Sequence, residues 1–469
     1  MNEWQTLTLA DVCTVITDGA HQSPKTVSRG KPMASVKDLT RFGVDLTSAR
    51  HIATEDFEAL VKQGCKPHVG DVLIAKDGNS ALDTVCTVDH PLDAVLLSSV
   101  AILRPDPKCL DSVFLKFYLS SPETIDYLKS NFISGAAIPR VVLRDFKRAE
   151  IRLPSLDVQR RIAGVLQSID SKIDLNRRVN QTLEAMAQAI FQSWFVEFDP
   201  VKAKIAAKQE GRDPLRAAMT AVSGKADAEL DALPPEQYEQ LAATAALFPG
   251  EMEASELGEI PKGWSHKALL QLTDKIGSGS TPRGGKEVYL EEGVALIRSQ
   301  NVYDSLFAWD GLARISDEAA AQLKGVTVQG EDVLLNITGA SILRTCVVEP
   351  DVLPARVNQH VAIIRAKAGV PPRFIHMHLL RPDIKNYLLG LNAGASREAI
   401  TKAHIESLVL LTPGPELLSA FQTAISPLFR QVHCLTRQMR ALGELRDTLL
   451  PKLLSGELLV ADAIAEAVA

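Results

Sequence analysis

Two loops rich in glycine and small hydroxyl residues carry side chains suited to binding. They read TDGAHQSP (residues 17–24) and GSGSTPRGG (residues 277–285). Imidazole, amide, hydroxyl and cationic groups of this kind contact phosphates and base edges in protein–DNA interfaces. An ordinary turn is the alternative interpretation of both loops. The candidate contact residues in and beside the two loops are His21, Gln22, Lys25, Ser280, Thr281, Arg283 and Lys286.

Two further groups of polar residues form candidate binding surfaces. One follows a strand-like run in each half of the chain and contains amides that could contact adenine. The second is a group of basic residues. A tight hairpin turn is the alternative for the first group, and a solvated helix face for the second. The first group is Lys76, Asn79 and Ser80 with Asn336, Thr338 and Ser341, and the second is Arg140 and Arg144 with Arg397 and Lys402.

Sequence signatures of catalysis are missing from the chain. We find no GxxxxGK[ST] phosphate loop, no HExxH, no GxSxG and no Asn-Pro-Pro-aromatic tetrapeptide of an adenine methyltransferase. His376 and His378 form an HxH pair without neighbouring ligand candidates, so we expect a surface or packing role rather than metal binding. The six cysteines are scattered without any CxxC, which favours a reducing compartment, the cytoplasm. The sequence therefore favours a binding protein without a metal or cofactor of its own.

The chain repeats itself at an interval near 260 residues. GDVLIAKDG (residues 70–78) returns as EDVLLNITG (331–339), and VAILR (100–104) returns as VAIIR (361–365). A solenoid repeats every 20–50 residues, so this interval indicates a duplicated unit instead. In each copy a Gly/Ser loop comes first, then short apolar strands, and then one helix-like stretch. Those stretches are residues 112–129 and 372–389.

A heptad pattern follows each copy. Apolar residues step by three and four from Val158 to Ile173, and again from Phe421 to Leu442. Each pattern predicts a helix of ~35–40 residues, or ~50–60 Å. Packing of each helix on its own domain is one possibility, but an antiparallel pair would bury both apolar stripes at once. Asn176 and Asn180 fall near the seam, where buried amides would set the register.

The composition is that of a globular protein with a net charge of −6, and no run of residues is apolar enough to span a membrane. Most of the negative excess lies in residues 199–258, which hold six Lys+Arg and eleven Asp+Glu. We expect that segment to be an alanine-rich connector with some helix. The rest of the chain is near neutral, so net charge neither supports nor excludes DNA binding.

In its order of domains and helices the chain resembles the DNA-specificity subunit of type I restriction–modification systems. The resemblance covers essentially the whole sequence, and the order and duplication of its strings make it specific. The strings that carry it are TDGAHQSP (17–24), SGSTP (278–282), LPSLDVQRRIAGVLQSIDSKIDLN (153–176), FQSWFVEFDPVKAK (191–204), SELGEIPKGW (255–264) and LRDTLLPKLLSGEL (445–458).

This resemblance implies an α+β fold, pseudo-two-fold symmetric, with two similar target-recognition domains separated by a pair of long antiparallel coiled-coil helices. The first domain would be residues 1–153 and the second 259–413. The central helix would be residues 154–198, the connector 199–258, and the C-terminal helix and tail 414–469. Such helices could span half-sites ~34–36 Å apart on double-stranded DNA.

The resemblance also implies that the subunit catalyses nothing by itself. Each domain would recognise half of a bipartite site, and the helices would space the domains and dock modification subunits. Those partners, carrying S-adenosylmethionine, would flip and methylate an adenine in each half-site. A restriction subunit using ATP and Mg²⁺ would join where one exists. A coiled-coil adaptor that never touches DNA, and a fused enzyme without recognisable motifs, are the alternatives.

Overall fold

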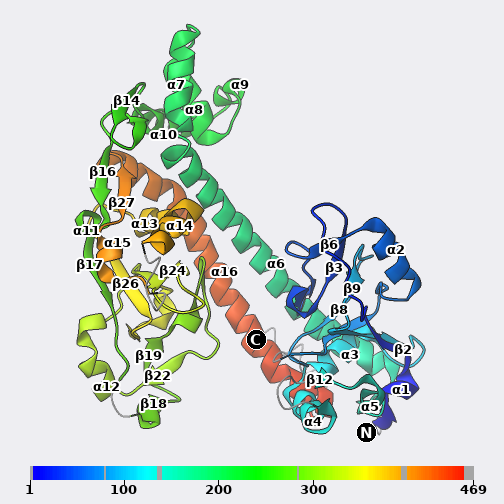
Figure 1. Cartoon of the computed structure of the whole chain (residues 1–469). Helices are drawn as coiled ribbons and strands as arrows, with labels where there is room; N and C mark the ends of the chain where they lie inside the picture. Colours follow the sequence, from blue (N-terminus) through cyan, green and yellow to red (C-terminus); the bar gives the residue numbers. More distant parts are fainter. Residues whose placement is uncertain (1–3, 79–80, 135–139, 283–284, 392–398, 459–469) are drawn as a thin grey trace. The chain divides into compact units, whose positions relative to one another are not determined.

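The structure is a computed structural model that describes residues 4–78, 81–134, 140–282, 285–391 and 399–458. The chain divides into two compact units, and Figure 1 labels many of their elements. The first unit contains residues 1–179 and 434–469, and the second contains residues 180–433. Each of the two long helices therefore contributes one part to each unit.

A four-stranded antiparallel sheet forms the centre of the first unit. Its order is β2 (Cys13–Asp18), β10 (Val100–Pro105), β7 (Val72–Ala75) and β8 (Val85–Thr87). Strands β7 and β8 are buried along their whole length. Their continuous run of β-branched and apolar residues is what a strand covered on both faces requires.

The second unit repeats this sheet strand for strand. The order is β17 (Thr273–Ser278), β26 (Val361–Ala366), β23 (Val333–Asn336) and β24 (Thr345–Val347). The repeated sequence strings are its two central strands in both units. The duplication predicted from the sequence is therefore a duplication of the fold.

A bidentate ion pair links the two repeated strings in each unit. Arg104 Nε and Nη2 lie 2.7 and 2.8 Å from the Asp71 carboxylate oxygens. Arg365 makes the equivalent contacts to Asp332 at the same two distances. Both carboxylates are fully buried, and an unpaired charge there would be costly. The aspartate of one string and the arginine of the other are therefore one structural feature.

Smaller strands and helices surround each central sheet. In the first unit they are β1 (Gln5–Thr8), α1 (Leu9–Val12), β3 (Lys31–Ala34), β4 (Leu39–Thr40), β5 (Gly43–Val44), β6 (Arg50–Ile52), α2 (Thr54–Lys62), β9 (Val95–Leu96), β11 (Ile133–Ser134), β12 (Arg140–Val141), α5 (Leu143–Phe146) and β13 (Glu150–Leu153). In the second they are β16 (Ser265–Ala268), α11 (Leu269–Leu272), β18 (Tyr289–Leu290), β19 (Val294–Ile297), β20 (Val302–Tyr303), β21 (Leu306–Phe307), β22 (Ala313–Ile315), α12 (Asp317–Gln322), β25 (Ala355–Val357), α15 (Lys402–Glu406) and β27 (Val409–Thr412). Short 3-10 turns, η1 (Val36–Asp38), η2 (Gly285–Val288), η3 (Ser299–Asn301), η4 (Lys324–Val326) and η5 (Pro350–Val352), connect some of them.

The helix-like stretch of each copy is two helices, where the sequence pattern predicted one. In the first unit α3 (Ser112–Leu119) is followed by α4 (Pro122–Phe132), and in the second α13 (Pro372–Leu380) is followed by α14 (Pro382–Gly390). Both second helices begin at a proline, which favours the first position of a helix and lacks the N–H that would continue the preceding one.

The long helices α6 (Leu156–Phe195) and α16 (Pro415–Ser455) pack antiparallel within each unit, as predicted. In the first unit Asn176 Nδ2 donates to Gln438 Oε1 at 2.8 Å. In the second, Asn180 Nδ2 donates to the Val432 carbonyl at 3.4 Å. From Asn176 to Asn180 the residue numbers rise along α6, while those of their partners on α16 fall from Gln438 to Val432. Both asparagines are buried. The prediction that these amides lie in the seam is confirmed.

The segment predicted as a connector with some helix is more ordered than expected. It forms α7 (Asp199–Gln209), α8 (Pro214–Ser223), α9 (Asp227–Leu230) and α10 (Pro235–Ala246), followed by the hairpin β14 (Met252–Ser255) and β15 (Gly258–Pro261). Ala218, Met219, Leu230 and Ala245 are completely buried in a core of their own. Alanine supplies close helix contacts here, whereas the composition alone suggested a linker.

Candidate nucleic-acid interface

A glycine follows the first sheet strand of each unit and lies against a neighbouring backbone. Gly19 N donates to Val100 O at 3.1 Å, and Gly279 N donates to Asn358 O at 3.1 Å. A Cβ on Gly19 would lie 2.2 Å from the Leu96 carbonyl oxygen, and one on Gly279 would lie 1.7 Å from that of Val357. Only glycine fits, so both predicted loops leave the sheet at the same point for the same steric reason.

In the first unit this loop meets the ends of two other strands. Asp18, the last residue of β2, accepts from Lys76 Nζ at 2.6 Å and lies 3.2 Å from His21 Nε2. Asp77, which follows Lys76 in the chain, accepts from Arg140 Nε at 3.0 Å and from Arg140 Nη2 at 3.3 Å. His21 and Arg140 keep 76% and 62% of their side chains exposed. The structure thus brings residues from all three predicted surfaces together in two neighbouring groups of polar contacts, linked through the adjacent residues Lys76 and Asp77.

Other predicted residues of the first unit lie around or outside this network. Gln22 and Lys25 are exposed on the loop, which Arg50 braces by donating to the Pro24 carbonyl at 2.9 Å. Arg144 is 89% exposed on α5 and lies 3.8 Å from Asp145 Oδ1. Asn79 and Ser80 lie outside the described residues, so their assignment stays a prediction.

The second unit has a neutral network in the corresponding place. The Thr281 hydroxyl donates to Gln359 Oε1, and Gln359 Nε2 lies 3.1 Å from His360 Nε2. His360 Nδ1 in turn lies 2.6 Å from Thr338 Oγ1. This network joins the predicted Gly/Ser loop to the turn after β23. In the first unit Asp18 joins the corresponding loop to the turn after β7. Ser280 is exposed beside it.

Of four further predicted residues of the second unit, the structure describes the side chain of Lys402 alone. Lys402 is 62% exposed at the start of α15, 3.4 Å from Glu406. Lys286 belongs to the short turn η2, and its side chain is not described. Arg283 and Arg397 lie outside the described residues. For these four positions DNA contact stays a prediction.

Two predicted contact residues are buried and serve the fold. Asn336 is 0% exposed, and its Nδ2 donates to the Ser299 carbonyl at 2.9 Å and to Ser341 Oγ at 3.1 Å. A base contact by Asn336 would break these buried hydrogen bonds, so we assign it to holding the turn that carries Thr338. Lys76 is only 5% exposed and neutralises Asp18. Both residues are buried and position their neighbours.

Sequence reasoning missed four members of the networks. Asp18 and Asp77 were inside stretches that were considered, but Gln359 and His360 were not. They come immediately before the repeated VAIIR string, where the first unit has Ser98 and Ser99. The sequence did contain a signal for them. The repeated strings mark the strands that the two copies share, and the residues just before those strings differ between the copies.

His376 and His378 pack inside the second unit, which is one of the two roles that the sequence left open for them. Burial lowers the pKa of each imidazole to about 3, so both are neutral at physiological pH. The described residues hold no group of three or more histidine, cysteine, aspartate or glutamate side chains suited to a metal ion. Among the described helices, none has an apolar stretch long enough to cross a bilayer.

Comparison with known proteins places the chain in a family. Residues 1–185 match the type I restriction modification DNA specificity domain. The specificity subunit of the type I restriction enzyme HindI from Haemophilus influenzae is 30% identical over 390 residues, 79% of this chain and 83% of that protein. The MjaIX specificity subunit from Methanocaldococcus jannaschii is 24% identical, with coverage of 73% and 68%.

A solved structure supports the fold. The S subunit of a type I restriction–modification system from M. genitalium covers 96% of this chain and of its own, with a TM-score of 0.50 and 14% sequence identity. The predicted α+β fold of two similar domains and long antiparallel helices is confirmed. With the HindI relative, these findings show that the chain belongs to the family of type I restriction-enzyme specificity subunits.

Proposed function

We propose that this chain selects the DNA site of a type I restriction–modification complex, and that each unit recognises one half of a bipartite sequence. One observation carries the proposal. Both units present a loop and a turn on the same framework, starting from Gly19 and Gly279, but the side chains differ. The first unit has Asp18, Lys76 and Arg140, whereas the second has hydroxyl, amide and imidazole groups.

The two networks suit different base edges. The exposed guanidinium of Arg140 could exchange Asp77 for a guanine edge, because arginine pairs with O6 and N7 in a bidentate manner. In the second unit the Gln359 amide fits an adenine edge better. Two unlike half-sites therefore follow, with base contacts concentrated at these loops and phosphates contacted by exposed cations such as Lys25 and Arg144.

Methyl transfer would belong to partner subunits that dock on α6 and α16. Exposed apolar side chains on α6 support docking there, since Leu175, Val179 and Met186 are 50%, 37% and 49% exposed. Those partners would supply S-adenosylmethionine and hold the flipped adenine. A restriction subunit using ATP and Mg²⁺ would join the complex where one is present. This chain contributes selection and spacing, and no catalytic group.

The experiment exchanges residues 5–153 for the matching segment of a specificity subunit with a different known target. Gln5 pairs with Leu153 in the β1–β13 ladder, so the segment begins and ends at one place and can be replaced as a module. The hybrid and the original are expressed with the modification subunits, and methylated adenines are mapped by sequencing.

One half of the methylated motif should change and the other should stay. The reciprocal exchange of residues 265–412, which are closed by the Ser265–Thr412 pair, should change the opposite half. Methylation that follows neither exchange would refute the proposal. A chain that assembles with partners but never selects DNA would instead favour an adaptor role.

A further inference from the structure

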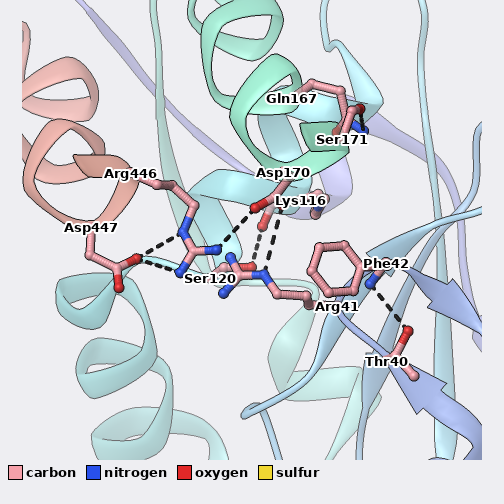
Figure 2. Close-up of polar contacts among 10 residues, drawn as sticks. All are labelled: Thr40, Arg41, Phe42, Lys116, Ser120, Gln167, Asp170, Ser171, Arg446 and Asp447. Carbon is pink, nitrogen blue, oxygen red and sulfur yellow. Dashed lines mark hydrogen bonds and ion pairs between the residues drawn. The ribbon is translucent and has the colours of Figure 1, made fainter. Parts of the chain in front are cut away.

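A buried ionic cluster joins the first recognition domain to both long helices within the first unit (Figure 2). At its centre is Asp170 of α6, whose side chain is 1% exposed. Lys116 Nζ of α3 lies 2.7 Å from one carboxylate oxygen, and Arg446 Nη1 of α16 lies 3.0 Å from the other. Arg41, in the β4–β5 turn, approaches to 3.7 Å. Three elements distant in sequence therefore converge on one carboxylate.

The cations dominate the electrostatics of this carboxylate. Burial alone would raise the pKa of Asp170, but Lys116 and Arg41 outweigh burial and hold the pKa below its ordinary value. Arg446 also donates to Asp447 at 2.8 Å, which balances part of the positive charge. Asp170 is thus charged at physiological pH, and each of its two oxygens is bonded to a different element.

Stability is a poor explanation for this arrangement. Apolar side chains of similar volume commonly replace a buried ion pair with no loss of stability. An apolar joint is already present around the cluster, where Leu166 and Ile169 of α6 pack with Leu449 and Leu450 of α16 and with the domain core. Apolar contact is nondirectional, and it would tolerate a range of rotations of the domain on the helices. Ionic hydrogen bonds add the direction that apolar packing lacks.

The second unit has no carboxylate at the position that corresponds to Asp170. His376 occupies the place of Lys116, four residues after the start of α13 as Lys116 is after the start of α3. Phe429 occupies the place of Asp170, fourteen residues after the start of its long helix. The ring of His378 meets those of Phe191 and Phe374 edge-on, at 4.8 and 4.7 Å between centroids. Arg373 of α13 covers the Phe429 ring at 3.8 Å from its centroid, and His433 of α16 lies 3.1 Å from Glu349. The second joint therefore combines aromatic and charged side chains without a central carboxylate.

We infer that Asp170, with Lys116 and Arg446, is a positioning site that sets the rotation of the first recognition domain on the helix pair and thereby the length of the gap between half-sites. This inference rests on the proposed function. Adding one base pair to the gap moves a half-site by ~3.4 Å and turns it by about 35°. Discrimination between adjacent gap lengths therefore requires a domain held within a fraction of that rotation.

The test measures gap length separately from half-site sequence. The full chain is expressed with its modification subunits, and the complex selects duplexes from a random library, which are then sequenced. The decisive variant combines Lys116→Met, Asp170→Leu and Arg446→Met, which removes the ionic bonds and keeps the volume. Asp170→Asn is the single-residue version, and Asp170→Glu is its conservative rescue.

A matched control removes an exposed carboxylate from the same helix. Asp157 is 77% exposed and lies 2.5 Å from Arg161, so Asp157→Asn removes an ion pair away from the joint. We expect the original chain and this control to select one gap length. The triple variant and Asp170→Asn should select the same half-sites, with the ratio of neighbouring to correct gaps raised at least tenfold. Asp170→Glu should restore most of the discrimination.

Two results would overturn the inference. A triple variant that folds and keeps the single gap length would show that the cluster sets no rotation. Should the triple variant fail to fold, an Asp170→Asn chain that binds less DNA at an unchanged gap would assign the cluster to stability alone. An original chain that selects no bipartite sequence would refute the proposed function instead, which keeps the two failures distinguishable.

Discussion

Replacing Gly279 by alanine should impair the second half-site and leave the first intact. The new Cβ would lie 1.7 Å from the Val357 carbonyl oxygen, and contacts under 3.0 Å essentially never occur, so the loop must retreat by at least 1.3 Å. That retreat would break the 3.1 Å bond from Gly279 N to Asn358 O and displace the Thr281 hydroxyl from Gln359. Two hydrogen bonds at ~1 kcal/mol each amount to ~2 kcal/mol.

A loss of that size corresponds to roughly 30-fold weaker binding of the second half-site. The control is Gly277→Ala, two residues earlier and inside β17, where a Cβ meets no atom within 4 Å. Duplexes carrying an intact or a scrambled second half-site are compared by competition binding to the complex. We expect Gly279→Ala to lose most of its preference for the intact half-site and Gly277→Ala to keep it. Equal behaviour of the two variants would refute the steric argument.

Two further predictions concern pH in the second unit. Because burial lowers the pKa of His378 from 6.5 to about 3, the unfolded chain binds a proton that the folded chain excludes, and stability falls as pH drops below 6.5. His378→Leu, which keeps an apolar contact with Phe191 and Phe374, should gain ~2 kcal/mol at pH 5 relative to its effect at pH 8, measured by urea unfolding; no difference between the two pH values would contradict this. Burial raises the pKa of Glu184 from 4.5 to about 7 despite the nearby Arg373, so stability falls as pH rises between these values. The free energy of unfolding of Glu184→Gln should therefore equal that of the original chain at pH 4.5 and exceed it at pH 8 by at most ~3 kcal/mol. A variant that is more stable than the original chain only at pH 4.5 would contradict this expectation.

Local patterns in the sequence were sufficient for the parts of the fold that depend on periodicity. The heptad spacing predicted α6 and α16 and placed Asn176 and Asn180 in their seam, because a helix position follows directly from sequence spacing. The repeated strings predicted the central strands for the same reason. The prolines at 122 and 382 were visible too, but the single-helix prediction ignored their meaning as helix starts.

Long-range polar contacts could not be predicted in this way. Lys116 and Arg446 meet on Asp170 from positions 54 and 276 residues away, and neither pairing leaves a periodic trace. The burial of Asn336 was equally hidden, since a polar residue at a strand end is compatible with an exposed turn or an internal bond. Gln359 and His360 joined the candidate site only when their partners across the sheet were known.

Comparison of the two copies within one chain separates what the fold requires from what recognition requires. Gly19 and Gly279 meet the same backbone constraint, and the bidentate pairs made by Arg104 and Arg365 have the same geometry. These features make the framework.

The contact loops and the joints to the helices differ in charge between the copies, although each difference occupies an equivalent place. The first unit has ion pairs beside its loop and a joint centred on a carboxylate. The second unit has hydroxyl, amide and imidazole groups beside its loop and a joint of aromatic rings with Arg373. A domain moved from one unit to the other would therefore keep the side chains of its contact loops. It would lose the contacts that α3 or α13 makes with the long helices. Moving recognition between positions requires moving the α3 or α13 face and its helix partners together with the loops.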